Sequence, residues 1–221
     1  SSSAKESTVM SKPTSREADK AKPGRPPVYT EKERCQRLLR AAEEVFTSTG
    51  YGAATMEEIA KSAGMSKKTL YAKYPDKEHL FAAMVGGLWD SPWENESAPP
   101  DEDAAAELRR RLHAMVQFIM TSRQVRLTRL LISEAERTPK LARDFHERVI
   151  SKARRYLAEA VERARDEGVG PQIDDVDQMT ATLLGAALAR NHLGALFGRK
   201  PKATKKQLED QVDTALRLLG Y

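Results

Sequence analysis

The stretch Ser62 to Phe81, SAGMSKKTLYAKYPDKEHLF, concentrates basic and aromatic side chains directly after a glycine. Six of its side chains suit contacts with nucleic acid: Lys67, Lys68, Thr69, Tyr71, Lys73 and Tyr74. Lysine can contact phosphates or guanine edges, threonine can meet a thymine methyl group, and tyrosine offers a hydroxyl and a flat apolar face. No acidic residue lies between Gly64 and Tyr74. These residues predict DNA binding, and the alternative is an ordinary solvated helix face.

Start and stop signals around this stretch predict four short helices between residues 30 and 88. The starts are two capping boxes, Thr30 with Glu33 and Thr55 with Glu58, and single caps at Ser66 and Asp76. The ends fall at Gly50, Gly64 and Pro75. Leu70, one turn after Ser66, is expected to pack inward. A helix, a glycine turn and a second helix at 55–74 form the plan of a helix-turn-helix, whose second helix enters the major groove.

Three further residues belong to the predicted contact set. Thr55 and Ser66 begin the two helices of the helix-turn-helix. Lys77 lies in the first turn of the fourth helix, where the dipole disfavours a cation, so an external anion such as a DNA phosphate is expected nearby.

The region from Thr30 to about Trp89 resembles the TetR family of transcriptional regulators. The resemblance is carried by AAEEVFTSTGYGAATMEEIAKSAGMSKKTLYAKYPDKEHLF, with its glycine-aromatic-glycine break and its Thr-Leu-Tyr triplet at 69–71. Lys73 stands where the family commonly has histidine, and Tyr74 where phenylalanine is usual. Both side chains can still contact DNA, so these departures concern sequence preference. The resemblance implies a DNA-binding domain over residues 30–89.

Residues 1–28 are predicted to be a disordered basic tail, because they hold few large apolar residues. The tail ends in KPGRPP, and Arg25 within it is expected to enter a narrow minor groove, whose negative potential attracts arginine. The alternative is a solvated linker. A similar element before the first helix recurs in proteins that this region resembles, which favours the DNA contact.

Residues 92–221 show only helical periodicity, so the chain is predicted to be all-α. The resemblance implies that these residues form a helical ligand-binding and dimerisation domain after the DNA-binding domain. Asp101, Ser122, the pair Thr138–Pro139, Val176 and the box Thr204 with Gln207 mark the expected helix starts. The run from Thr138 to Glu167 is expected to form one helix. The resemblance implies that the last two helices form a homodimer interface; the alternative is that they complete a monomer core.

The helical phase of the larger apolar side chains suggests a pocket for a small apolar or aromatic effector in this second domain. Its expected lining is Trp89, Trp93, Met115, Phe118, Phe145 and Met179, although such residues also occur in plain cores. The segment RLLISEAERTPKLARDFHERV resembles the C-terminal domain of one branch of the family, which is linked to efflux and stress genes.

Other classes of protein lack support in the sequence. The four histidines have no metal-ligand spacing, and no nucleophile elbow or phosphate-binding loop occurs, so no enzyme, cofactor or metal is expected. The single cysteine, Cys35, falls in an apolar stripe and fits a reducing cytoplasm, and no apolar run is long enough to span a membrane. The sequence therefore predicts a ligand-responsive repressor that releases palindromic double-stranded DNA, with a constitutive architectural DNA-binding dimer as the alternative.

Overall fold

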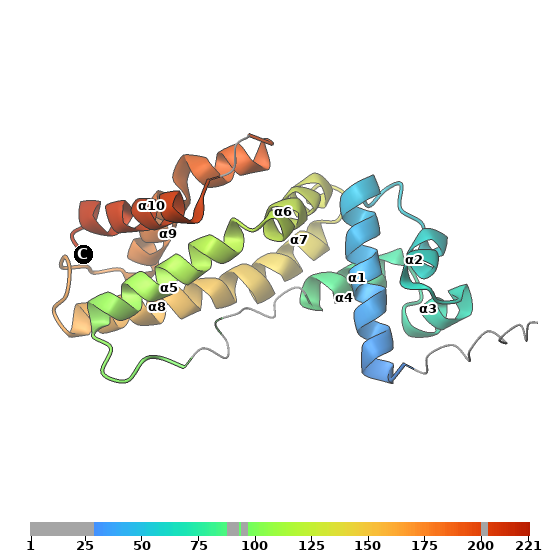
Figure 1. Cartoon of the computed structure of the whole chain (residues 1–221), viewed down its shortest axis with the longest axis horizontal. Coiled ribbons are helices and arrows are strands. Elements are labelled where there is room, and N and C mark those ends of the chain that lie inside the picture. Colours follow the sequence, from blue (N-terminus) through green and yellow to red (C-terminus); the bar gives the residue numbers. More distant parts are fainter. Residues whose placement is uncertain (1–28, 88–92, 94–96, 200–202) are drawn as a thin grey trace, which may run out of the picture.

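The computed structural model describes residues 29–87, 93, 97–199 and 203–221, and within these ranges every regular element is a helix. The expected all-α class is confirmed. Helices α1 to α4 gather at one end of the molecule, while α5, α8, α9 and α10 form the other end, and α6 and α7 lie between the two groups (Figure 1). None of the described helices is long and apolar enough to cross a membrane.

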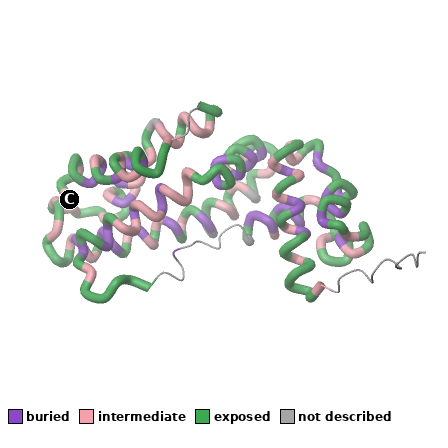
Figure 2. Tube along the Cα trace, in the orientation of Figure 1, coloured by how far each residue is buried: buried purple, intermediate pink, exposed green. Residues whose placement is uncertain are grey.

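The N-terminal helices are α1 (Glu31–Thr49), α2 (Met56–Ala63), α3 (Lys67–Lys73) and α4 (Lys77–Gly87). The remaining helices are α5 (Ala104–Ile119), α6 (Ser122–Glu134), α7 (Pro139–Phe145), the π-helix η1 (His146–Ile150), α8 (Ser151–Asp166), α9 (Val176–Leu196) and α10 (Lys205–Leu218). In both groups the buried residues line the sides of the helices that face one another (Figure 2).

Local capping determines where most helices begin. All three predicted capping boxes, headed by Thr30, Thr55 and Thr204, are formed in both directions. Gly64 ends α2 in the left-handed conformation, with φ of 66°, which glycine adopts without steric cost. One predicted start was wrong by two residues, because Asp103 caps α5 in place of Asp101. Helix α6 begins at Ser122 as predicted, with Thr121 as its cap.

A compact aromatic centre joins the N-terminal helices. Phe46 of α1 and Phe81 of α4 meet edge to face at 5.2 Å between ring centroids, and Tyr51 packs on both rings. The core is larger than the sequence boundary at residue 89 implies, because three leucines of α6, Leu127, Leu130 and Leu131, are buried in it. Helix α6 is therefore attached to the N-terminal group directly.

Two irregularities interrupt helices that the sequence predicts as continuous. The predicted run is helical from Pro139 to Asp166, but the π-helix η1 separates α7 from α8. Within α9, Ala189 has φ of 29° and ψ of −133°, which breaks the helix. The Gln211 side chain of α10 donates to the carbonyl of Ala186 at 3.4 Å. In an unbroken helix that carbonyl would accept from the backbone N–H four residues later.

Candidate nucleic-acid interface

Helix α3 presents one face to solvent because a single leucine holds the other face in the core. Leu70 is fully buried, and Ser66 caps the helix by accepting a hydrogen bond from the Thr69 backbone N–H at 3.1 Å. The side chains of Lys67, Lys68, Tyr71 and Lys73 are exposed, with Tyr71 at 46%. Thr69 and Tyr74 are half-buried, and Tyr74 packs against the N-terminal core. The structure thus brings the predicted lysines and Tyr71 onto one exposed surface.

Two of these lysines already have acidic partners within the protein. Lys67 pairs with Glu57 of α2, and Lys73 pairs with Glu31 of α1 at 2.7 Å. The hydrogen bond and charge of Lys73 lower the pKa of Glu31, and the same interaction raises the pKa of Lys73. Lys68 has no ion-pair partner among the described residues. The two glutamates were not predicted, because acidic residues in a first helical turn are typical of any helix start.

A groove of about 340 Å³ separates α3 from α1. Its lining is Glu31, Arg34, Cys35, Leu38, Lys68, Thr69, Ala72 and Lys73. Arg34 thus joins the lysines as a further cation on this surface, although nothing in its local sequence distinguishes it from other arginines of α1. Cys35, which the sequence places in an apolar stripe, is half-buried and lines this groove.

Thr55 and Ser66, the two predicted DNA contacts at helix starts, cap the helices that they precede. The Thr55 hydroxyl donates to the Glu58 carboxylate at 2.9 Å and accepts from the Glu58 backbone N–H at 3.2 Å. The Ser66 hydroxyl lies 2.9 Å from that of Thr69. Both hydroxyls are therefore engaged in capping, and the predicted DNA contacts of these two residues are not tested by the structure.

Lys77 has an internal explanation that the sequence did not reveal. Its ammonium group donates to the carbonyls of Tyr51 at 2.7 Å, Ala54 at 3.0 Å and Gly52 at 3.2 Å, and it lies 4.6 Å from the centre of the Tyr51 ring. These carbonyls compensate for a cation at a helix start. An external anion is not needed to account for Lys77.

Four of the side chains predicted to line one effector pocket lie in the same core, and a fifth lies in the other core. Trp93, Met115, Phe118 and Met179 belong to the C-terminal core, but Phe145 packs against the N-terminal core. Trp93 meets Phe118 edge to face at 5.0 Å and stacks on Tyr156 at 5.4 Å, so these rings fill the space between them. Arg25 and Trp89 lie outside the described residues. Phe145 therefore does not line a pocket together with the other four predicted residues.

Cavities elsewhere in the C-terminal group have a different character. The largest that we describe, about 630 Å³, lies between α9 and α10 beside the kink at Ala189. Most of its lining side chains are polar or small: Met120, Ala189, Asn191, Gly194, Ala195, Arg199, Ala203, Gln207, Asp210, Gln211 and Thr214. None of the predicted pocket residues contributes to it.

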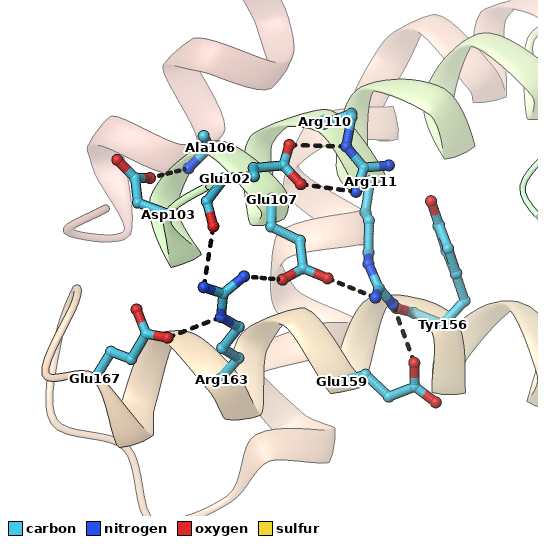
Figure 3. A network of polar contacts seen from close by, with 10 residues as sticks. All are labelled: Glu102, Asp103, Ala106, Glu107, Arg110, Arg111, Tyr156, Glu159, Arg163 and Glu167. Carbon is cyan, nitrogen blue, oxygen red and sulfur yellow. Dashed lines mark hydrogen bonds and ion pairs between the residues drawn. The ribbon is translucent and has the colours of Figure 1, made fainter. Parts of the chain in front are cut away.

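An ion-pair network joins α5 to α8 in the same domain (Figure 3). Glu107, 6% exposed, accepts hydrogen bonds from Arg111 and Arg163. Burial acts to raise the pKa of Glu107, but the two guanidinium groups outweigh it and lower the pKa below its usual value. Arg163 also bonds to the Glu102 carbonyl and to Glu167. This network holds the two helices in register.

The two halves of the chain match known protein families separately. Residues 38–84 match the bacterial regulatory proteins of the tetR family, and residues 106–219 match the C-terminal domain of the AefR-like transcriptional repressors. Over 53 residues, 24% of either chain, the sequence is 49% identical to the HTH-type transcriptional activator FasR of Mycolicibacterium smegmatis (strain ATCC 700084 / mc(2)155). The chain spans from a quarter to about half of the length of the curated relatives it matches.

Solved structures resemble the whole arrangement. A crystal structure from Mesorhizobium loti MAFF303099, described as a TetR-family transcriptional regulator, superposes with a TM-score of 0.72 at 25% identity, over 86% of this chain and 97% of the other. The flavonoid-responsive regulator FrrA superposes with a TM-score of 0.67 at 29% identity, over 84% of this chain and 94% of that one. The similarity therefore extends well beyond the helix-turn-helix.

Proposed function

The chain belongs to the TetR family of bacterial regulatory proteins, and we propose that it is a ligand-responsive transcriptional repressor that binds palindromic operator DNA as a homodimer in the cytoplasm. The observation that carries this proposal is the exposed cationic face of α3, supported from behind by the fully buried Leu70. Helix α3 follows α2 after a glycine turn, as the recognition helix does in a helix-turn-helix.

In the proposed complex α3 lies in the major groove. Lys68 and Tyr71 occupy the middle of its exposed face, while Lys67 and Lys73 lie at its two ends. Cations contact phosphates independently of sequence, and base edges in the groove supply the specificity. The minor-groove contact of Arg25 belongs to the same proposed complex. The phosphate contact that the sequence suggested for Lys77 is left out of it, because the Lys77 ammonium group already donates to three backbone carbonyls.

A homodimer is supported by the outward side of α9 and α10. On α9 the small residues Gly185 and Ala186 and the large residue Leu193 are exposed in the single chain, and on α10 Leu218 is 76% exposed. Small side chains let another helix approach closely. A two-fold dimer would place two recognition helices on half-sites about 34 Å apart or a multiple of that distance.

Repression and ligand response rest on the relatives and on the connection between the two groups of helices. The C-terminal match is to repressors, and the name of FrrA states a response to flavonoids, which are aromatic. Arg123 of α6 forms a bidentate ion pair with Glu43 of α1, and both N–O distances are 2.7 Å. Further along α6, in the middle of the helix, Arg129 donates to the carbonyl of Leu196 on α9 at 2.7 Å. We infer that α6 would transmit a shift of α9 to the DNA-binding helices.

The alternative function is a constitutive architectural DNA-binding dimer without an effector. The packing of Trp93 against Phe118 and Tyr156 favours it, because these rings fill the space expected for an aromatic ligand. Titration with aromatic and apolar compounds separates the two functions. A ligand-responsive repressor changes its tryptophan fluorescence and releases operator DNA together, whereas the architectural protein changes neither signal.

The DNA-binding surface itself is tested with Lys68→Ala and Tyr71→Ala on an operator found by genomic footprinting. Both variants should weaken binding, and Lys68→Ala should also reduce the slope of log K against log salt by about 0.9, the value for one lost phosphate contact. Lys206→Ala removes a lysine that is also exposed but lies on α10, and it serves as the control. Unchanged affinity and slope in both test variants would contradict the placement of α3 in the groove.

A further inference from the structure

We propose that Glu31 and Glu57 set the strength of DNA binding, because each holds one recognition-helix lysine in an ion pair that DNA has to break. The inference rests on the proposed function, since it requires α3 to face the phosphates. The inference adds two acidic residues to the predicted DNA-binding surface, whose only charged residues until now were cations.

The two pairs lie at opposite ends of α3. Glu57 of α2 holds Lys67, the first residue of α3, and Glu31, the first residue of α1, holds Lys73, the last residue of α3. The Lys73 ammonium is 2.7 Å from the Glu31 carboxylate. Lys68 lies between them on the same helix and has no such partner among the described residues.

Both pairs are open to solvent and therefore to DNA. The side chains of Lys67 and Glu57 are 59% and 54% exposed, and those of Lys73 and Glu31 are 42% and 72% exposed. Exposed ion pairs are weak, so phosphate can replace the carboxylate as the partner of each lysine. The lysines also lower the pKa of each glutamate, which keeps both carboxylates charged at neutral pH.

The low net charge of the surrounding helices makes these two carboxylates important for DNA affinity. Residues 29–87 carry nine lysines and arginines and eight aspartates and glutamates, so this part of the chain is almost neutral. Its attraction for DNA depends on where the charges lie and little on their sum. An acidic residue beside α3 therefore has more effect on binding than the same residue elsewhere.

Exchange of partners leaves a carboxylate beside the DNA. When a lysine moves to a phosphate it displaces one condensed cation, but the freed glutamate next to the phosphates retains a cation of its own. The net release of cations is then smaller than the number of lysine contacts. Since the salt dependence of binding measures that release, the two glutamates should make it shallower and should weaken binding to any sequence.

The test uses Glu31→Gln, Glu57→Gln and the double variant in the full chain, on the operator and on an unrelated duplex between 50 and 300 mM salt. Each single change should tighten binding to both duplexes about two- to fivefold, as expected for one exposed pair, and should steepen the salt slope by up to about 0.9. Glu44→Gln is the matched control, because it removes the same charge from α1 at an exposed position that lines the groove against α6. It should leave the slope unchanged.

A double-mutant cycle shows whether the effect belongs to the pair. In the background of Lys73→Met, Glu31→Gln should tighten binding less than it does in the wild type, because no ion pair then has to be broken. An equal gain in both backgrounds would mean that the effect does not come from the pair. Thermal unfolding confirms that each variant is folded.

Two outcomes overturn the inference, and they are distinguishable. If Lys68→Ala weakens binding but the two glutamate variants behave like Glu44→Gln, the pairs do not restrain binding and the proposed function stands. If the lysine and glutamate variants all bind DNA like the wild type, α3 does not face the phosphates, and both proposals fail.

Discussion

Replacement of Lys77 by methionine separates two roles that this residue could have. The structure gives its ammonium group two partly buried hydrogen bonds, to Tyr51 and Ala54, a more exposed one to Gly52, and a position over the Tyr51 ring. Hydrogen bonds from a charged donor contribute about 1.5–3 kcal/mol when well buried, and an exposed cation–π contact adds roughly 0.5–1 kcal/mol. Since water can replace part of these contacts, we expect Lys77→Met to lower the free energy of unfolding by about 2–4 kcal/mol.

For a chain of this size that loss corresponds to a fall in Tm of roughly 4–16 °C. Circular dichroism during heating and in urea measures it, and Lys68→Met is the control. Lys68 is a lysine of α3 whose side chain is exposed, so its replacement should change stability by less than about 0.5 kcal/mol. The salt slope of DNA binding by Lys77→Met should remain that of the wild type. A stable Lys77→Met variant whose slope falls by about 0.9 would refute this reasoning and assign the ammonium group to a phosphate.

Three further predictions concern the C-terminal helices. Leu218→Arg combined with Gly185→Glu should give monomers in sedimentation, because both sites are exposed in the single chain and charge there opposes close helix packing; a stable dimer would move the interface elsewhere. Glu107→Ala should cost about 1–3 kcal/mol in urea unfolding, because Arg111 and Arg163 lose their shared buried partner but keep Glu159 and Glu167; a loss below about 0.5 kcal/mol would mean that water screens the network. Burial lowers the pKa of His192, so only the unfolded chain binds its proton just below pH 6.5, and stability should decrease as pH falls through that value. His192→Leu should make this decrease smaller, and an identical pH dependence in the variant would contradict it.

Local rules were sufficient for the elements that carry the candidate site. The cap of Thr55, the left-handed turn at Gly64 and the cap of Ser66 each depend on residues within a few positions, so the sequence alone placed α2 and α3. The inward direction of Leu70 followed from helical spacing, and with it the outward direction of Lys68 and Tyr71. Those predictions did not depend on contacts between distant segments of the chain.

Other properties required contacts between distant segments. Phe145 has the same kind of helical phase as Met115, yet it packs on the other core, because α7 lies against α4 and α6. Periodicity predicts that a side chain is buried but does not identify its partners. The same limit applies to Ala189, whose break in α9 is accompanied by a hydrogen bond from Gln211, 22 positions later.

For the candidate site, the sequence by itself determined that a short helix would present lysine and tyrosine to solvent after a glycine turn. Only the tertiary structure decided what those cations meet. Glu31 is 42 positions from Lys73, and the carbonyl of Tyr51 is 26 positions from the Lys77 ammonium. Electrostatic interactions depend on distance in space, and a long, flexible side chain reaches whichever partner the packing of other helices brings within a few ångströms.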